Sequence, residues 1–185
     1  MSLKFIKGFC PSLREPIKAS DGLLLRIRPY MDYLDFDKLL ALCNLSINYG
    51  SGILELTNRG SIQIRGIKEN NHKVFLDKIL KKKIVENDTN IHNSNIIINP
   101  FWEYGDQNFV VYNKIIKLHK QLPKLPNKFG FVIDIGKRLS LKNISADIRI
   151  ESAPNKKILI RADGSVKGKI IESKNINKFV SELVD

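Results

Sequence analysis

The chain has 185 residues, of which 43% are hydrophobic and 27% charged, a composition that is ordinary for a folded globular protein and excludes a largely disordered chain. It carries 31 Lys and Arg against 19 Asp and Glu, so its formal net charge is +12. This charge indicates an anionic partner, for which nucleic acid, an anionic membrane surface and a polycarboxylate ligand all qualify. A coding bias toward Lys, Asn and Ile explains the charge equally well.

Two cysteines, Cys10 and Cys43, are too few to supply the four thiolates that hold an iron–sulfur cluster, and no close Cys or His pair indicates zinc. We therefore expect no metal site in this chain itself. The first residues lack a long apolar run, and no later stretch approaches the ~18 apolar residues of a membrane helix. The sequence thus predicts no signal peptide and no membrane span, and we expect a cytoplasmic protein with reduced thiols.

The first 20 residues contain Pro11 and Pro16 without a clear period, so they are predicted to form an extended arm. A strand is predicted over Gly22–Pro29, where apolar and polar residues alternate. Asp35 is a candidate N-cap for a helix over Phe36–Tyr49. The apolar stripe that this helix is expected to bury, with Cys43 as a packed core residue, consists of Phe36, Leu39, Leu40, Cys43 and Ile47.

Alternation resumes over Ile53–Thr57 and Ser61–Arg65, and Asn58-Arg59-Gly60 supplies the turn chemistry of a hairpin. A second amphipathic helix follows, and a short strand is predicted at Ile84–Val85. The apolar residues of that helix are Phe75, Leu76, Ile79 and Leu80. Strand, helix, two strands, helix and strand form the ferredoxin-like pattern, in which both helices pack on one sheet face.

The polar stretch 87–94 is a predicted domain boundary. Strands are predicted over residues 95–99, 129–135, 147–151, 157–161 and 166–171, and helices over 107–122 and 175–183. The fold class is therefore α+β, with a ferredoxin-like half-domain followed by a second α/β unit with a mainly antiparallel sheet. The predicted organisation is an arm over residues 1–20, the half-domain over 21–90 and the second unit over 91–185.

Arginine is concentrated in the strands of the first predicted unit. The chain has eight arginines, and four of them are Arg26, Arg28, Arg59 and Arg65. Alternation places these side chains and Gln63 on a polar sheet face. A guanidinium binds an oxyanion in a bidentate way that a Lys ammonium cannot match, so the cluster predicts a site for an anionic ligand. The alternative is a merely solvated sheet face.

The hairpin LTNRGSIQIRG, the strand GLLLRIRP and the arm GFCPSLREP resemble the amino-terminal half of the precorrin-3B synthases, a branch of the sirohaem-dependent nitrite and sulfite reductase superfamily. LPNKFGFVIDIG and ISADIRIES extend the resemblance over most of the chain. It implies a nitrite/sulfite reductase ferredoxin-like half-domain, with sirohaem or a precorrin-type tetrapyrrole bound at the junction of two such repeats. The family's 4Fe-4S cluster is expected only in the missing half, which holds its four cysteines.

The resemblance also implies which residues bind the tetrapyrrole or an anion. Arg28 matches the family's arginine of the first strand, and Lys128 matches the first lysine of its K-F-K element. Thr57, Arg59 and Gln63 match its T-x-R-Q-x-x-Q-x-H hairpin. The expected binding residues are Arg28, Thr57, Arg59, Gln63, Arg65 and Lys128, with no catalytic residue assigned.

Some positions depart from the reductases. Gly60 stands for a glutamine and Arg65 for a histidine, both as in the synthase branch, and Gly130 stands for the second lysine of K-F-K. A further anion-binding arginine of the reductases would fall near Ser94, where this chain has no arginine. The lack of this arginine and of the second lysine of K-F-K disfavours reduction of sulfite or nitrite.

The resemblance thus implies an oxidoreductase of cobalamin biosynthesis, active only with a second copy of the chain or a separate cluster-bearing C-terminal half. In this reading the chain would bind and orient a polycarboxylated tetrapyrrole, which the complete enzyme hydroxylates with oxygen. The alternatives are a nitrite/sulfite reductase-like fragment, a non-catalytic tetrapyrrole-binding module and an RNA-binding basic sheet. The polar strand faces carry no Phe or Tyr for base stacking, which disfavours nucleic acid.

Overall fold

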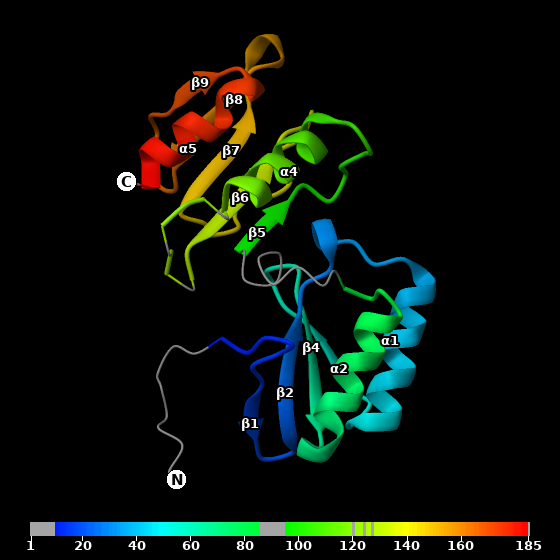
Figure 1. Cartoon of the computed structure of the whole chain (residues 1–185). Helices are drawn as coiled ribbons and strands as arrows, with labels where there is room; N and C mark the ends of the chain where they lie inside the picture. Colours follow the sequence, from blue (N-terminus) through cyan, green and yellow to red (C-terminus); the bar gives the residue numbers. More distant parts are fainter. Residues whose placement is uncertain (1–9, 86–94, 120, 124, 127, 185) are drawn as a thin grey trace. The chain divides into compact units, whose positions relative to one another are not determined.

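The structure is a computed structural model that describes residues 10–85, 95–119, 121–123, 125–126 and 128–184. The chain divides into two compact units, residues 1–92 and 93–185, and each is described by itself (Figure 1). The stretch 87–94, predicted from the sequence to be a boundary, lies outside the described residues. No described helix is long and apolar enough to cross a membrane.

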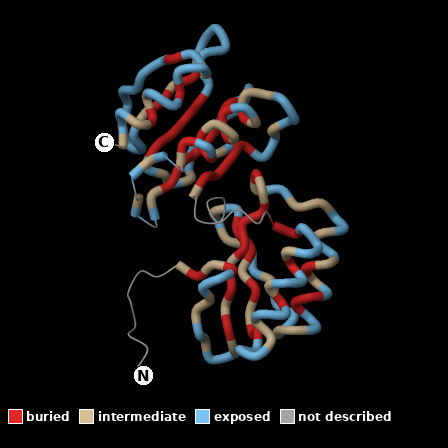
Figure 2. Tube along the Cα trace, viewed as in Figure 1, coloured by how far each residue is buried: buried red, intermediate tan, exposed pale blue. Residues whose placement is uncertain are grey.

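The first unit is a four-stranded antiparallel sheet in the order β1-β2-β4-β3, and two helices lie on one of its faces (Figure 1). Its elements are β1 (Ile17–Ala19), β2 (Gly22–Ile27), α1 (Phe36–Tyr49), β3 (Leu54–Leu56), β4 (Ile62–Ile67) and α2 (His72–Lys81). Leu25 and Ile64 on the sheet and Phe75 and Ile79 on α2 are fully buried in the core between these layers (Figure 2). The strand order β2-β4-β3 with two helices is the ferredoxin-like arrangement predicted from the sequence.

Helix α1 has the predicted bounds, and its cap is confirmed because the Asp35 carboxylate accepts a 2.8 Å hydrogen bond from the backbone N–H of Lys38. The stripe that it buries was predicted wrongly. The helix turns Leu42 and Leu45 toward the core, whereas the predicted core residues are largely exposed. Their exposed fractions are 75% for Phe36, 40% for Leu39, 50% for Leu40 and 65% for Ile47, and Cys43 is half-buried. Two apolar stripes share this helix, and periodicity cannot tell which faces the sheet.

The outer edge of the sheet beside β2 also differs from the prediction. Ile17–Ala19, expected to belong to an irregular arm, form strand β1 and pair antiparallel with β2. Ile84 and Val85 are buried but lie in a bend rather than a strand. Ser20 and Asp21 form the tight turn between β1 and β2, and Gly22, whose φ is +129°, pairs with Ala19 directly after it. The strand β1 thus occupies the edge of the sheet beside β2, where the ferredoxin-like pattern would place residues 84–85.

The second unit is a five-stranded sheet in the order β5-β6-β7-β8-β9. Its elements are β5 (Asn95–Ile98), α4 (Gln107–His119), β6 (Gly130–Asp134), β7 (Ile148–Ser152), β8 (Ile158–Ala162), β9 (Lys169–Ile171) and α5 (Ile176–Val184). The α+β class is confirmed. β7, β8 and β9 pair antiparallel as predicted, whereas β5, β6 and β7 are parallel, so the sheet is mixed. Residues 99–129 and 135–147 are long enough to return the chain to the starting end of the sheet, which parallel pairing requires.

Candidate functional site

The sheet face away from the helices carries a polar row across three strands of the first unit. Arg26, Gln63 and Glu55 lie side by side because Gln63 is in register with both of the others. When the Gln63 amide oxygen is turned toward Arg26, it accepts a 2.7 Å hydrogen bond from Nη2, and the amide nitrogen donates to Glu55 at 3.2 Å. This row links the donors of the face into one hydrogen-bonded chain.

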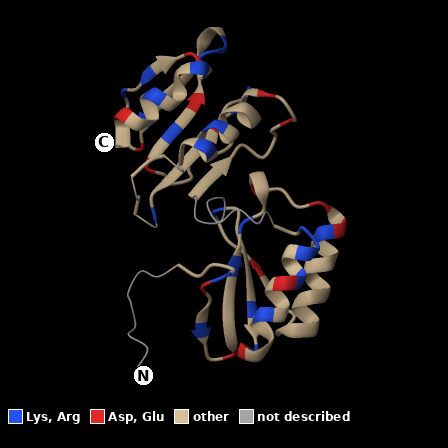
Figure 3. Ribbon diagram, viewed as in Figure 1, with Lys and Arg blue, Asp and Glu red and all other residues tan. Residues whose placement is uncertain are grey.

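Arg65 lies on the same face as Gln63, two residues along β4. Its Nε donates to Asp21 at 3.1 Å and its Nη1 to Glu55 at 3.4 Å. The hydrogen bond to Asp21, followed by the charges of Asp21 and Glu55, raises the pKa of the guanidinium. The Arg65 side chain remains 29% exposed, so it is a partly accessible cation that already has carboxylate partners. Figure 3 shows that both basic and acidic positions occur along the strands and turns of this unit.

The turn between β3 and β4 is held by its own side chains. The Thr57 hydroxyl accepts hydrogen bonds from the backbone N–H groups of Ser61, at 3.1 Å, and Arg59, at 3.4 Å. Gly60 has a φ of +66°, a conformation that most other residues adopt only with strain. The turn therefore presents Arg59 from a fixed backbone, and the Arg59 side chain is partly exposed.

Arg28 is 6% exposed and points into the base of this turn. Its Nη2 donates to the Arg59 carbonyl at 3.0 Å and to the Ser61 hydroxyl at 3.3 Å. Arg28 thus holds the backbone that carries Arg59, a supporting position that the sequence pattern does not distinguish from direct ligand contact.

Asp32 lies at the same turn and was missed by sequence reasoning. It belongs to a short 3-10 turn, Tyr30–Asp32, in which Met31 and Asp32 have φ values of 54° and 53°. The Asp32 carboxyl group lies so close to Gly60 that a Cβ added there would stand 2.7 Å from its Cγ. Left-handed non-glycine residues are rare, and no local pattern at positions 31–32 predicts them.

The predicted site residues divide between the two units. Thr57, Arg59, Gln63 and Arg65 all belong to the β3–β4 hairpin, and Arg28 donates hydrogen bonds to its turn from the end of β2. Lys128 is exposed and precedes β6 in the second unit. The donors of the first unit are guanidinium and amide groups, which fit the carboxylates of a tetrapyrrole. Among the described residues no group of His, Cys, Asp or Glu could hold a metal ion.

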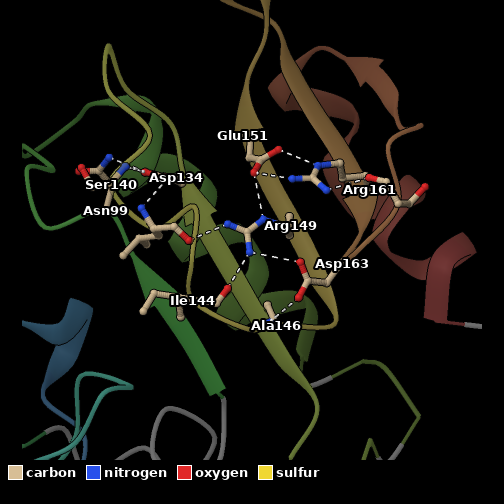
Figure 4. A network of polar contacts seen from close by, with 11 residues as sticks. Asn99, Asp134, Ser140, Ile144, Ala146, Arg149, Glu151, Arg161 and Asp163 are labelled. Atoms are coloured by element: carbon tan, nitrogen blue, oxygen red, sulfur yellow. Dashed lines mark hydrogen bonds and ion pairs between the residues drawn. The ribbon is translucent and has the colours of Figure 1, made fainter.

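A second arginine cluster lies on the sheet of the second unit (Figure 4). Arg149 is 1% exposed and donates to Glu151 at 3.0 Å, to Asp163 at 3.3 Å and to the Ile144 and Leu141 carbonyls, both at 2.7 Å. Arg161 binds both oxygens of Glu151, at 2.8 and 3.0 Å. Sequence reasoning did not single out these arginines, because a strand pattern does not reveal which charges are paired.

The carboxylates of this second cluster are held in the charged form. Burial opposes ionisation of Glu151, but hydrogen bonds from Arg161 and Arg149 outweigh it, and its pKa lies below the ordinary 4.5. The backbone N–H of Ala146 lowers the pKa of Asp163, with Arg149 adding to the effect. Nearby, the buried Asp134 carboxylate accepts from Asn99 and from the backbone of Ser140 and Leu141. These contacts fix loop 136–147 against the sheet, so this cluster is structural.

Residues 16–82 match the family model of the nitrite/sulfite reductase ferredoxin-like half domain, and this range runs from β1 to the end of α2. The first unit is therefore a half domain of that class. The chain is also similar to the precorrin-3B synthase of a Sinorhizobium species, at 33% identity over 154 residues. That match covers 79% of this chain and 32% of the relative, so the chain spans about a third of its length.

A solved structure, that of the Mycobacterium tuberculosis NirA protein, has the same fold with a TM-score of 0.65. The match covers 90% of this chain and 35% of that one at 11% identity, so it carries the fold alone. Together the three comparisons confirm the predicted resemblance to the amino-terminal region of precorrin-3B synthase within the nitrite/sulfite reductase superfamily.

Proposed function

We propose that this chain binds a polycarboxylated tetrapyrrole, of the sirohaem or precorrin type, through the arginine-bearing sheet of its first unit. It would act there as the amino-terminal part of a precorrin-3B synthase-like oxidoreductase. The observation that carries the proposal is the hairpin turn at residues 57–61, which Arg28 and Thr57 hold from below and which presents Arg59. A preorganised cation of this kind loses little conformational freedom when it binds a carboxylate.

Two residues of the site would hold the hairpin turn in place, and three would contact the ligand. Arg28 and Thr57 are positioning residues because they bond the turn itself. Arg59, Gln63 and Arg65 present the donors that would bind ring carboxylates. Lys128, in the second unit, is assigned as an anion-binding residue by the family pattern alone.

The acids on the sheet set a cost for binding. Arg65 is already bonded to Asp21 and Glu55, so a ligand carboxylate must share or displace these partners. Glu55 also accepts a hydrogen bond from the Gln63 amide nitrogen, so it competes with a ligand for both donors. We therefore expect Glu55→Gln to strengthen binding of an anionic macrocycle, because it removes one negative charge and leaves the donors in place.

The chemistry on the macrocycle would require more than this chain. When bound in the complete enzyme, a 4Fe-4S cluster supplies the redox chemistry, and neither Cys10 nor Cys43 has a cluster-forming set of thiolates beside it in the described residues. This chain's own residues would bind and orient the ring. We propose that a second copy of the chain or a separate cluster-bearing polypeptide completes the active unit.

An absorbance titration with sirohaem tests the binding step. We expect saturable binding that weakens at least about tenfold in Arg59→Ala, since a charged hydrogen bond is worth roughly 1.5–3 kcal/mol. Lys82→Ala, an exposed lysine beyond α2, is the matched control and should leave binding unchanged. Unchanged binding in both Arg59→Ala and Arg28→Ala, with the circular dichroism of folded protein, would remove the arginine sheet from the proposal.

A further inference from the structure

Helix α1 has a second apolar face that the described residues of the first unit leave largely exposed. Phe36, Leu40 and Ile47 are 75%, 50% and 65% exposed, and the half-buried Cys43 lies between the last two. We call these four residues, Phe36, Leu40, Cys43 and Ile47, the outer stripe. At about 100° per residue they fall within a sector of roughly 60°, well away from the direction of the buried Leu42 and Leu45. An apolar row of this length on one helix indicates a contact surface.

The spacing of the outer stripe is the same in both chain directions. Its members are spaced by four, three and four residues, so an antiparallel copy places Phe36 opposite Ile47 and Leu40 opposite Cys43. Each pairing then joins a larger side chain to a smaller one. Self-complementarity of one patch is the condition for a twofold symmetric contact between identical chains.

Charge favours the same arrangement. The chain has a net charge of +12, which as a whole opposes self-association. Helix α1 carries none of this excess: its charges are Asp37 and Lys38, and Lys38 is paired with the N-cap Asp35 at 3.2 Å. The start of the helix is thus acidic, whereas at its end Lys78 lies 5.8 Å above the ring of Tyr49. Antiparallel pairing brings the acidic end of one α1 to the basic end of the other. It also places the positive end of each helix dipole beside the negative end of the other.

We propose that the outer stripe is the surface on which a second copy of this chain docks, with the two α1 helices antiparallel about a twofold axis near Leu40 and Cys43. This inference does not depend on tetrapyrrole binding, because none of the residues on the arginine face takes part. Apolar contact favours the dimer, whereas the positive net charges of the two chains repel each other. Salt screens this repulsion, so the dissociation constant of the dimer should fall as the salt concentration rises.

Light scattering coupled to gel filtration, over a range of concentrations of the full chain, measures the association. We expect a concentration-dependent dimer whose dissociation constant rises at least about tenfold in Leu40→Arg and Ile47→Arg. Val74→Arg, which places the same charge on a 45% exposed apolar position of α2, is the matched control and should remain dimeric. Phe36→Ser, at a more exposed position, gives a milder test in case an arginine variant fails to fold.

Cys43 provides a native reporter of the geometry. In a Cys10→Ser background, a short bismaleimide should join two chains through Cys43, because the two thiols lie on either side of the proposed axis. A monomer at every concentration would overturn the proposal and indicate that the second unit or a different protein covers the stripe. A dimer that neither crosslinks nor responds to Leu40→Arg would overturn it equally, because another surface would then hold the copies together.

Discussion

Each of the two units carries arginine on its sheet, and the partners of those arginines differ. In the second unit loop 136–147 supplies carbonyl acceptors to Arg149, which is 1% exposed and also bonds two carboxylates. In the first unit Arg65 is 29% exposed, and its partners Asp21 and Glu55 are themselves 34% and 45% exposed. Alternation along a strand does not distinguish the two clusters, and sequence reasoning singled out only the first. The accessibility of the partners is what separates a structural guanidinium from one that could receive a ligand.

The largest expected effect on stability comes from removing Arg149 from the arginine cluster of the second unit. Arg149→Ala removes one partner of the buried Glu151 and one of the more exposed Asp163, and breaking a buried ion pair by removing one member costs about 3–5 kcal/mol. Trp102, the single tryptophan, lies in the second unit and reports its unfolding by urea through fluorescence. The exposed Arg138 is the control, and Arg138→Ala should change stability by less than about 0.5 kcal/mol. Equal, small losses in both variants would mean that the cluster is not structural.

Acid should weaken the second unit through the same cluster. The pKa of Glu151 is lower in the folded chain than the ordinary 4.5, so its ionised form stabilises the fold above that value. This stabilisation is lost as the pH falls below about 4.5 toward the folded pKa, and Asp163 acts in the same direction. We expect the Trp102 urea midpoint to fall over this range, and to fall less steeply in Glu151→Gln. An identical pH slope in that variant would assign the acid sensitivity elsewhere.

The smallest effect on stability is expected at Arg65 and its carboxylate partners in the first unit. Arg65 makes its ion pairs near solvent, where such pairs contribute little, so Arg65→Ala should leave the urea midpoint of the chain within experimental error. The same variant should weaken sirohaem binding in an absorbance titration. A clear loss of stability without a loss of binding would mean that Arg65, like Arg149, has a structural role and does not bind the ligand.

Local sequence signals predicted the elements of the fold well. Asp35 followed by a periodic segment defined α1 to the residue, and Asn58-Arg59-Gly60 marked the turn between β3 and β4. Signals that depend on partners far along the chain were not available. The periodicity of α1 could not show that Leu42 and Leu45 rather than Phe36 and Ile47 face the sheet. Nor could a five-residue strand show whether its neighbour is parallel, because that depends on the path of the connection.

The predicted site residues stay a prediction, and sequence reasoning was limited here for the same reason. Residue types and the family resemblance indicated the arginines, but the burial of Arg28 beneath the turn follows from its bonds to Arg59 and Ser61, residues more than 30 positions away. Asp32 left no signal, since its position depends on two left-handed residues that the sequence does not mark. Lys128 was assigned by resemblance alone.

The closeness of Asp32 to Gly60 links two positions that are far apart in the chain. A Cβ at residue 60 would stand 2.7 Å from the Asp32 carboxyl group, so a larger residue at position 60 requires the Asp32 side chain to move or to be replaced. We expect relatives that carry a long side chain at position 60, as the reductases carry glutamine, to show a compensating change at position 32. Gly60→Gln should distort the hairpin through both this contact and the positive φ of residue 60, and Asp32→Gly should relieve only the contact.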